Sequence, residues 1–406
     1  MQIASIETYA VGRPPEMTQG LPGEFLVTPL HVFPDYQRLL GERFVGLRGG
    51  PVYAVLARVR TDDGICGIGS AGVGSGATAY IIEHHLAPIV TGQNPFDVEL
   101  LWEQMFRAVI NYGRKGVVLE AISAIDIALW DIMGRATGQP VYNLLGGRTR
   151  ERIQVYGSRL YEREDLDLLA PEAAEMVRQS FKAVKQRFGF GPRDRPAGMR
   201  KNLELVKTVR QAVGSEIELM GDAYMGWDVP YAIRMIRQIE DTGLDLKWVE
   251  GPLIPDDIDG YARICRAVHT PISGGEHEFT RYGYRELVRR EAVDILQPDV
   301  NRVGGITEAR KIWALAAAEG LAVIPHAGQS HNYHMVMAHL NSPMAEYFPP
   351  PDEGGALDDD TLFWEIFKGE PRAEDGYITL RDAPGLGLDW NEDNVRKWRW
   401  GDAAEN

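Results

Sequence analysis

The alternation of apolar and polar positions in the first third of the chain predicts both strands and helices. Residues 2–10 alternate as a strand does, and two further alternating runs, 52–60 and 65–70, flank the turn pair Asp63-Gly64 of a β-hairpin. Apolar residues recur at helical spacing over 77–90, 96–109 and 116–137, and Gly138 follows the last of these segments. We therefore expect an α+β domain over residues 1–140.

From about residue 152 onwards, short apolar runs alternate with helical patterns. The runs predict eight strands, at 153–157, 183–187, 217–222, 246–250, 271–275, 292–297, 322–325 and 345–348. Helical spacing lies between many of them, at 200–213, 229–242, 258–268, 281–289 and 306–319. This alternation is typical of a closed parallel β/α barrel, which we place at residues 150–375. A doubly wound open sheet would alternate in the same way, but no glycine-rich phosphate turn follows the first strand.

Composition narrows the class of protein further. The 406 residues carry a formal net charge of −15, which excludes a general nucleic-acid binder and disfavours a partner of anionic membranes. Cys66 and Cys265 lie far apart, so we expect no disulfide framework and a cytoplasmic location. No stretch approaches 18 apolar residues, and residues 1–12 lack the basic start of a signal peptide. The tail 376–406 holds Trp390, Trp398 and Trp400 and is expected to pack back on the first domain.

Acidic residues end three successive strands of the expected barrel. Asp222, Glu250 and Glu276 are 28 and 26 residues apart, which is one β/α unit each. The carboxyl ends of barrel strands open on one face, so the three side chains would converge there and raise one another's pKa. A divalent cation removes this repulsion, and an all-oxygen set suits Mg²⁺. The alternative is that each acid caps the helix that follows it.

The next two strand ends supply a possible base. Asp299 and His326 follow the sixth and seventh strands. If the two side chains lie side by side, the carboxylate fixes the ring tautomer of the histidine and raises the basicity of its other nitrogen. The alternative is a purely structural pair.

Two cations, Lys185 and Arg187, end the second strand. Residues two apart on a strand face the same way, so both can hold a substrate carboxylate or steady an oxyanion. The pKa of arginine is too high for a base, whereas a desolvated lysine can serve as one. The alternative is a pair of solvated surface side chains. His277 can lie beside the metal or in the following loop, and Glu346 on the last strand can supply a proton or a hydrogen bond.

The order of these residues, from Lys185-x-Arg187 to His326, resembles that of the enolase superfamily. Segments 125–131, 144–147 and 297–299 resemble its mandelate racemase subgroup, and segments 28–30, 273–277 and 323–326 resemble L-rhamnonate dehydratases and related acid-sugar dehydratases. The resemblance implies a modified TIM barrel of (β/α)7β type under an N-terminal capping domain. It also implies one Mg²⁺ per subunit on Asp222, Glu250 and Glu276, a His326–Asp299 dyad, and a symmetric homo-oligomer, an octamer or smaller.

The activity that the resemblance implies is Mg²⁺-dependent dehydration of an aldonic acid such as L-rhamnonate or L-lyxonate. His326 would take the C2 proton to give a metal-stabilised enediolate, and loss of the C3 hydroxyl, with His326 or His277 as the acid, would yield a 2-keto-3-deoxy acid. Racemases of the subgroup carry a lysine where this chain has Arg187, which favours dehydration. A cycloisomerase, an epimerase or racemase, and a catalytically silent binding protein are the alternatives.

The capping domain is expected to read the distal hydroxyls of the substrate. Loops 12–32 and 70–76 would close over the barrel mouth and exclude water. Rhamnonate-type enzymes tend to carry a histidine in the N-terminal loop, but residues 19–27 of this chain contain none. His31 is the histidine nearest to that loop.

Overall fold

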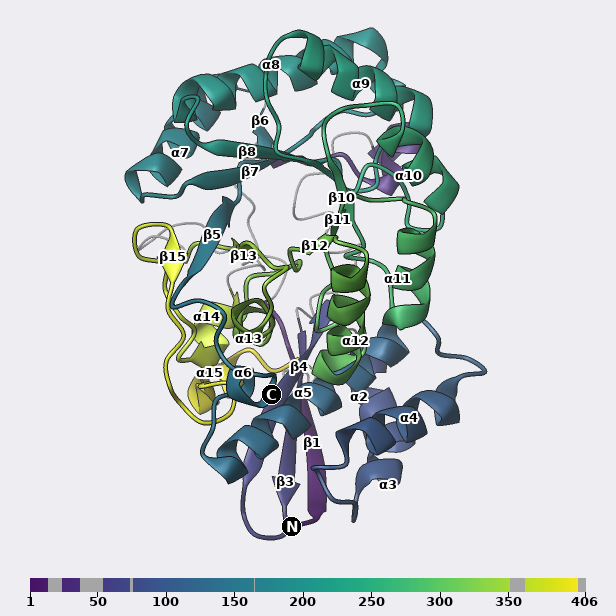
Figure 1. Ribbon diagram of the computed structural model, residues 1–406, viewed down its shortest axis with the longest axis vertical. Coiled ribbons are helices and arrows are strands. Elements are labelled where there is room, and N and C mark those ends of the chain that lie inside the picture. The colour runs from purple at the N-terminus through teal and green to yellow at the C-terminus, as the bar shows by residue number, and fades with distance from the viewer. Residues whose placement is uncertain (14–23, 37–53, 74–75, 164, 351–361, 401–406) are drawn as a thin grey trace.

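The computed structural model describes residues 1–13, 24–36, 54–73, 76–163, 165–350 and 362–400. An antiparallel sheet lies at one end of the molecule and a curled parallel sheet surrounded by helices lies at the other (Figure 1). Parts of both expected lid loops, residues 14–23 and 74–75, fall outside the described residues. No described helix is long and apolar enough to cross a lipid bilayer.

The antiparallel sheet has the order β1-β3-β4 and packs on one long buried helix. Its strands are β1 (Ile3–Val11), β3 (Ala54–Thr61) and β4 (Cys66–Val73), and the helix is α5 (Val117–Thr137). Gly69 allows the close packing of β4, because a Cβ there would overlap the carbonyl oxygen of Ala124 on α5. Gly138 ends α5 in the left-handed conformation, with φ +67°.

The helix predicted at 77–90 is divided into three parts. They are α2 (Gly76–Ile81), a π-helical turn η4 (Ile82–Leu86) and α3 (Ala87–Val90). Pro88 has no N–H to donate to the preceding turn, so the α-helical hydrogen-bond ladder cannot run through this point. The helix predicted at 96–109 is α4 (Val98–Val109).

The parallel sheet contains the eight predicted strands in chain order, and β13 pairs with β5. The strands are β5 (Ile153–Ser158), β7 (Ala183–Arg187), β8 (Glu218–Asp222), β9 (Val249–Glu250), β10 (Ile272–Gly274), β11 (Ile295–Leu296), β12 (Ala322–Val323) and β13 (Ala345–Tyr347). Among the described residues, no ladder joins β12 to β13. Seven strand–helix units followed by a last strand confirm the expected (β/α)7β architecture.

Helices cover the outer face of the parallel sheet (Figure 1). They are α7 (Leu166–Arg178), α8 (Arg195–Val213), α9 (Val229–Asp241), α10 (Ile258–Cys265), α11 (Thr280–Arg289), α12 (Gly305–Ala318) and α13 (Ser330–Ala338). Short elements in the connections are β2 (Glu24–Phe25), η2 (Pro29–Val32), η3 (Pro34–Tyr36), α6 (Val141–Leu144), β6 (Glu162–Arg163) and η5 (Pro192–Asp194). β2 pairs with β6, which brings the N-terminal segment to the mouth of the barrel.

Inside the barrel, a separate buried cluster supports the strand ends. It consists of Tyr156, Ala183, Met220, Trp248, Ile324 and Met344. Each of these residues stands two positions before a polar residue of the barrel mouth, as Met220 does before Asp222 and Trp248 before Glu250. Residues two apart on a strand face the same way, so the inward packing of the apolar residue also aims the polar one inward.

The C-terminal residues contact both parts of the molecule. They form α14 (Leu362–Ile366), β14 (Phe367–Lys368), β15 (Tyr377–Ile378), β16 (Asp389–Trp390) and α15 (Glu392–Lys397). β15 pairs with β5 of the barrel, and the ring of Trp390 meets that of Tyr9 edge-on at 5.4 Å between centroids. The domain boundaries stay predictions.

Candidate active site

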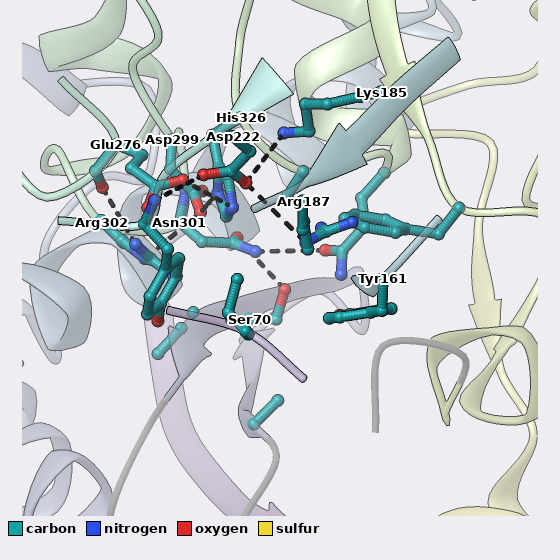
Figure 2. Close-up of a pocket in the computed structure, with 18 of the residues that line it drawn as sticks. Ser70, Tyr161, Lys185, Arg187, Asp222, Glu276, Asp299, Asn301, Arg302 and His326 are labelled. Carbon is teal, nitrogen blue, oxygen red and sulfur yellow. Dashed lines mark hydrogen bonds and ion pairs between the residues drawn. The ribbon is translucent and has the colours of Figure 1, made fainter. Parts of the chain in front are cut away.

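A cavity of about 90 Å³ lies at the carboxyl ends of the barrel strands, opposite the β3–β4 hairpin. The hairpin contributes Ser70, Ala71 and Gly72 to its lining. Among the sequence-predicted residues, the cavity lining includes Lys185, Arg187, Asp222, Glu276, Asp299 and His326 (Figure 2). The structure therefore brings together side chains from five different strand ends at one mouth.

The three acids of the expected metal set are all buried at this mouth. Asp222 pairs in register with Glu250 between β8 and β9, and Glu276 follows the adjacent strand β10. Asp222 and Glu276 line the cavity, whereas Glu250 is outside its lining and only 1% exposed. Burial raises the pKa of Asp222 and raises that of Glu250 to about 7, with the charge of Glu276 acting in the same direction.

Cationic side chains face these acids in the present arrangement. Oε1 of Glu250 lies 2.6 Å from Nζ of Lys185, and its Oε2 accepts hydrogen bonds from Trp248 Nε1 and Gln297 Nε2. Oε1 of Glu276 lies 2.6 Å from Nε2 of His277. Within the part of the chain that the structure describes, no three His, Cys, Asp or Glu side chains already lie in a geometry that could hold a metal ion.

The chemistry of the acids nevertheless fits Mg²⁺. All three are carboxylates, the oxygen ligands that a hard divalent cation prefers. Oδ2 of Asp222 is 3.7 Å from Lys185 Nζ and 3.8 Å from Arg187 Nε, so both cations stand beyond hydrogen-bonding distance. A divalent cation among these oxygens would offset the repulsion that contributes to the raised pKa values of Asp222 and Glu250. Burial raises the pKa of Glu276 as well, but His277 and His326 outweigh it and hold that pKa well below its usual value.

Asp299 and His326 lie side by side at the cavity. Nδ1 of His326 is 2.9 Å from Oδ2 of Asp299, and Oδ1 of Asp299 accepts a hydrogen bond from the backbone N–H of Asn301 at 2.9 Å. Burial lowers the pKa of His326, but the charge of Glu276 and the hydrogen bond that His326 donates to Asp299 outweigh it and raise that pKa to about 9. Burial raises the pKa of Asp299, and His326 and Arg302 bring it below its usual value.

Lys185 lines the cavity at its floor, where its amino group is buried between carboxylates. Its Nζ lies 2.6 Å from Glu250 Oε1 and 2.8 Å from Glu346 Oε1, and it is 1% exposed. Burial lowers the pKa of Lys185, but these neighbours raise it well above the usual value, so the side chain is a cation. A lysine held in this state is a source of positive charge rather than a base.

Glu346 is fully buried and is outside the lining of the cavity. Its Oε2 accepts a hydrogen bond from the backbone N–H of Ala327, the residue after His326, at 2.9 Å. Burial raises the pKa of Glu346, but Lys185 and His326 bring it down to about 2. As a carboxylate it accepts hydrogen bonds and has no proton to supply.

Arg187 faces the cavity from the end of β7. Its Nη1 donates to the carbonyl oxygen of Arg159, and its Nη2 lies 3.3 Å from Ser158 Oγ. The guanidinium stands 4.6 Å over the ring of Tyr161, which also lines the cavity. These contacts leave it fixed on the side of the mouth opposite Glu276 (Figure 2).

The two other histidines considered from the sequence lie beside the cavity rather than in its lining. His277 is half-buried, with Nδ1 3.0 Å from Arg302 Nη1 and Nε2 2.6 Å from Glu276. His31, on η2, is buried with Nε2 2.8 Å from Asp194 Oδ2.

The sequence reasoning missed several residues of the mouth. Asn301 and Arg302 follow Asp299 by two and three positions, and Tyr224 follows Asp222 by two. Their position just after predicted strand ends was a signal that could have found them. No such signal marked the backbone of Tyr224 and Ala327, whose φ values of +38° and +69° only the surrounding structure can enforce.

Comparison with known proteins identifies the family to which both parts of the chain are similar. The profile of the mandelate racemase / muconate lactonizing enzyme N-terminal domain matches residues 51–146, and that of the enolase C-terminal domain-like family matches residues 168–394. L-rhamnonate dehydratase of Saccharopolyspora erythraea is 37% identical over 370 residues, which cover 91% of this chain and 90% of that protein.

Solved structures agree with these matches. The crystal structure of L-rhamnonate dehydratase from Gibberella zeae has a TM-score of 0.85 at 34% identity and covers 98% of this chain and 95% of that chain. A structure of the same enzyme complexed with Mg also has a TM-score of 0.85. The 3,6-anhydro-D-galactonate cycloisomerase from Zobellia galactanivorans has a TM-score of 0.81 at 29% identity and covers 98% of this chain and 99% of that chain. The chain therefore belongs to the mandelate racemase / muconate lactonizing enzyme family of the enolase superfamily.

Proposed function

We propose that the protein dehydrates an aldonic acid of the L-rhamnonate or L-lyxonate kind to a 2-keto-3-deoxy acid. It is an enzyme of the hydro-lyase class, like its dehydratase relatives. The observation that carries the proposal is the placement of the His326–Asp299 pair and Arg187 around the same buried acids at one cavity. One base and one acid suffice for this reaction, and His326 can be both in turn.

The cofactor is Mg²⁺, and Asp222, Glu250 and Glu276 are the residues that would hold it. When bound, Mg²⁺ acts as a Lewis acid on the substrate carboxylate and makes the C2 proton more acidic. For loading, Oε2 of Glu276 would exchange its contact with His326 for the ion, while Oε1 keeps its contact with His277.

His326 is our choice for the group that takes the C2 proton. When the ring is neutral, its Nδ1–H donates to the Asp299 carboxylate, and Nε2 carries the lone pair that accepts a proton. The pKa of about 9 belongs to the arrangement in which Glu276 Oε2 lies 3.2 Å from Nε2, so the neutral ring requires Glu276 to turn from His326 to the metal ion. The electron pair of the broken C2–H bond moves into the substrate carboxyl group. It returns to form the C2–C3 double bond as the C3–O bond breaks, and protonated His326 gives its proton to the departing hydroxyl, which leaves as water. The resulting enol becomes the 2-keto-3-deoxy acid.

Among the residues that the structure describes, the side of the cavity opposite His326 carries no comparable base. Arg187 stays protonated at any physiological pH, and its guanidinium is suited to hold the substrate carboxylate in a bidentate manner. Lys185, at the floor of the cavity, is a cation paired with the buried carboxylate of Glu346. Removal and return of a proton on opposite faces of C2, as a racemase requires, is therefore disfavoured.

A library of five- and six-carbon sugar acids tests the proposal directly. Each acid is incubated with the protein and Mg²⁺ in D₂O, and products are identified by mass spectrometry, with His326→Asn as the inactive control. We expect loss of water from at least one acid. Deuterium at C2 without loss of water would instead support an epimerase, and no reaction with any member would defeat the proposal.

The remaining expectations stay proposals with their own measurements. Light scattering on the purified protein tests the homo-oligomer, for which the expected state is an octamer or smaller. The lid role of loops 12–32 and 70–76 is tested by protection of these loops from proteolysis when substrate is added.

A further inference from the structure

One guanidinium, that of Arg302, touches both halves of the site. Its Nη1 lies 3.0 Å from the carbonyl oxygen of Glu276 and 3.0 Å from Nδ1 of His277. Its Nε lies 3.4 Å from Oδ2 of Asp299, the oxygen that also receives the His326 hydrogen bond. Arg302 thus connects two loops of the site. The loop after β10 carries Glu276, a proposed metal ligand, and the loop after β11 carries Asp299, the partner of the proposed base His326.

Arg302 is also held in place by the capping domain. The side chain is 9% exposed, and a Cβ on Gly72 of β4 would lie only 3.1 Å from its Cγ. Figure 2 shows Arg302 on the same side of the cavity as Glu276, away from Lys185 and Tyr161. A buried, tightly packed guanidinium has few alternative positions, so its contacts constrain the groups that it touches.

The contact with His277 has a chemical consequence. An arginine nitrogen can only donate, so Nδ1 of His277 accepts and the proton of the neutral ring sits on Nε2. That Nε2 lies 2.6 Å from Oε1 of Glu276. Arg302 therefore fixes the His277 ring with its Nε2 proton in ion-pair contact with the Glu276 carboxylate, while it also binds the backbone carbonyl of the same glutamate.

We infer that Arg302 is a positioning residue for Glu276 as a metal ligand, acting both through the Glu276 backbone and through His277. The inference rests on the proposed function, in which Glu276 holds Mg²⁺. A carboxylate that is already oriented loses less freedom when it binds a metal, and loss of such outer contacts typically weakens metal binding about 10- to 100-fold.

The test is calorimetric titration of Mg²⁺ into the metal-free full-length protein, independent of turnover. We expect Arg302→Met and His277→Ala each to weaken Mg²⁺ binding about 10- to 100-fold. Because one acts partly through the other, the double variant should lose less than the product of the two single losses. Arg302→Lys keeps the charge but cannot reach the Glu276 carbonyl, His277 and Asp299 with one nitrogen, so its loss should be intermediate.

Arg135→Met is the matched control. Arg135 also binds a buried carboxylate, Asp131, and a backbone carbonyl, that of Leu388, but it is not part of the cavity lining. Its replacement should leave Mg²⁺ affinity unchanged, and thermal unfolding of every variant separates loss of fold from loss of affinity. If Arg302→Met does not fold, Arg302→Lys and His277→Ala form the cycle instead.

The outcomes separate this inference from the proposed function. The positioning role would be overturned if the Arg302 variants bound Mg²⁺ as tightly as the parent protein. It would also be overturned if the fold-loss in the double variant equalled the product of the two single fold-losses. Either result leaves dehydration by the parent protein unaffected. A parent protein that binds no Mg²⁺ would overturn both.

Discussion

Replacement of Asp299 by asparagine isolates the role of the dyad with almost no change of shape. Oδ1 of Asp299 accepts the Asn301 N–H at 2.9 Å, and Oδ2 accepts from His326. In Asp299→Asn, the amide oxygen is expected to keep the backbone hydrogen bond. The amide NH₂ group then faces Nδ1 of His326, which must accept, so the ring proton moves to Nε2 and blocks the atom that should take the C2 proton.

The size of the effect follows from these two hydrogen bonds. If the side-chain amide of the Asp299→Asn variant rotates by about 180°, its oxygen faces His326 and again accepts from Nδ1–H, which leaves Nε2 free to act as the base. Its NH₂ group then faces the buried backbone N–H of Asn301, and this unsatisfied donor costs about 1–3 kcal/mol. That cost alone reduces the competent fraction about 5- to 150-fold. Because a general base contributes typically about 10²- to 10⁴-fold, we expect kcat to fall by about 10²- to 10⁴-fold in total.

Initial rates of 2-keto-3-deoxy acid formation measure the effect, with deuterium exchange at C2 as a second readout. Asp294→Asn is the matched control, because Asp294 accepts a backbone hydrogen bond from Ile272 next to the opposite end of β11 and should tolerate the change. A folded Asp299→Asn protein whose kcat stays within tenfold of the parent would refute the reasoning.

Two further predictions concern buried charges. Lys185→Met should lower the free energy of unfolding of the metal-free protein by about 3–5 kcal/mol in urea titrations, because Glu250 and Glu346 lose their buried cation; unchanged stability would contradict this account. Asp126 is 0% exposed, and burial raises its pKa to about 7. Between about pH 4 and 7 the carboxyl group therefore holds a proton in the folded state that it releases in the unfolded state. The free energy of unfolding consequently falls as the pH rises through this window. Asp126→Asn should remove about 3 kcal/mol of this pH dependence in unfolding measured at pH 4.5 and pH 8, and equal pH dependence in both proteins would argue against it.

The strand ends illustrate what could be predicted from the sequence. Met220 and Asp222, or Trp248 and Glu250, occupy alternate positions of short apolar runs, and the runs recur at the period of a β/α unit. Since parallel strands of a barrel present the same end at one face, this pattern suffices to predict a closed parallel β/α barrel and to expect the acids, Asp299 and His326 at its mouth. The (β/α)7β type of the barrel followed from the family resemblance.

Helix boundaries and backbone conformations were harder to predict from the sequence where contacts with residues distant in the chain determine them. The helix expected at 77–90 contains a π-helical turn at Ile82–Leu86, and α7 and α13 were absent from the predicted set. Tyr224 and Ala327 adopt positive φ values without being glycine, because their loops are held on both sides by the barrel mouth.

The amino-acid sequence by itself determined which strand carries each ionisable group, because the two-residue period of a strand and the order of a parallel barrel leave little choice. Only the tertiary structure decided which charges meet: Lys185 between Glu250 and Glu346, and Arg302 against Glu276, His277 and Asp299. The reason is that electrostatic pairing in a buried site depends on distances of a few ångströms between side chains far apart in the chain, and these distances exist only after the loops have packed.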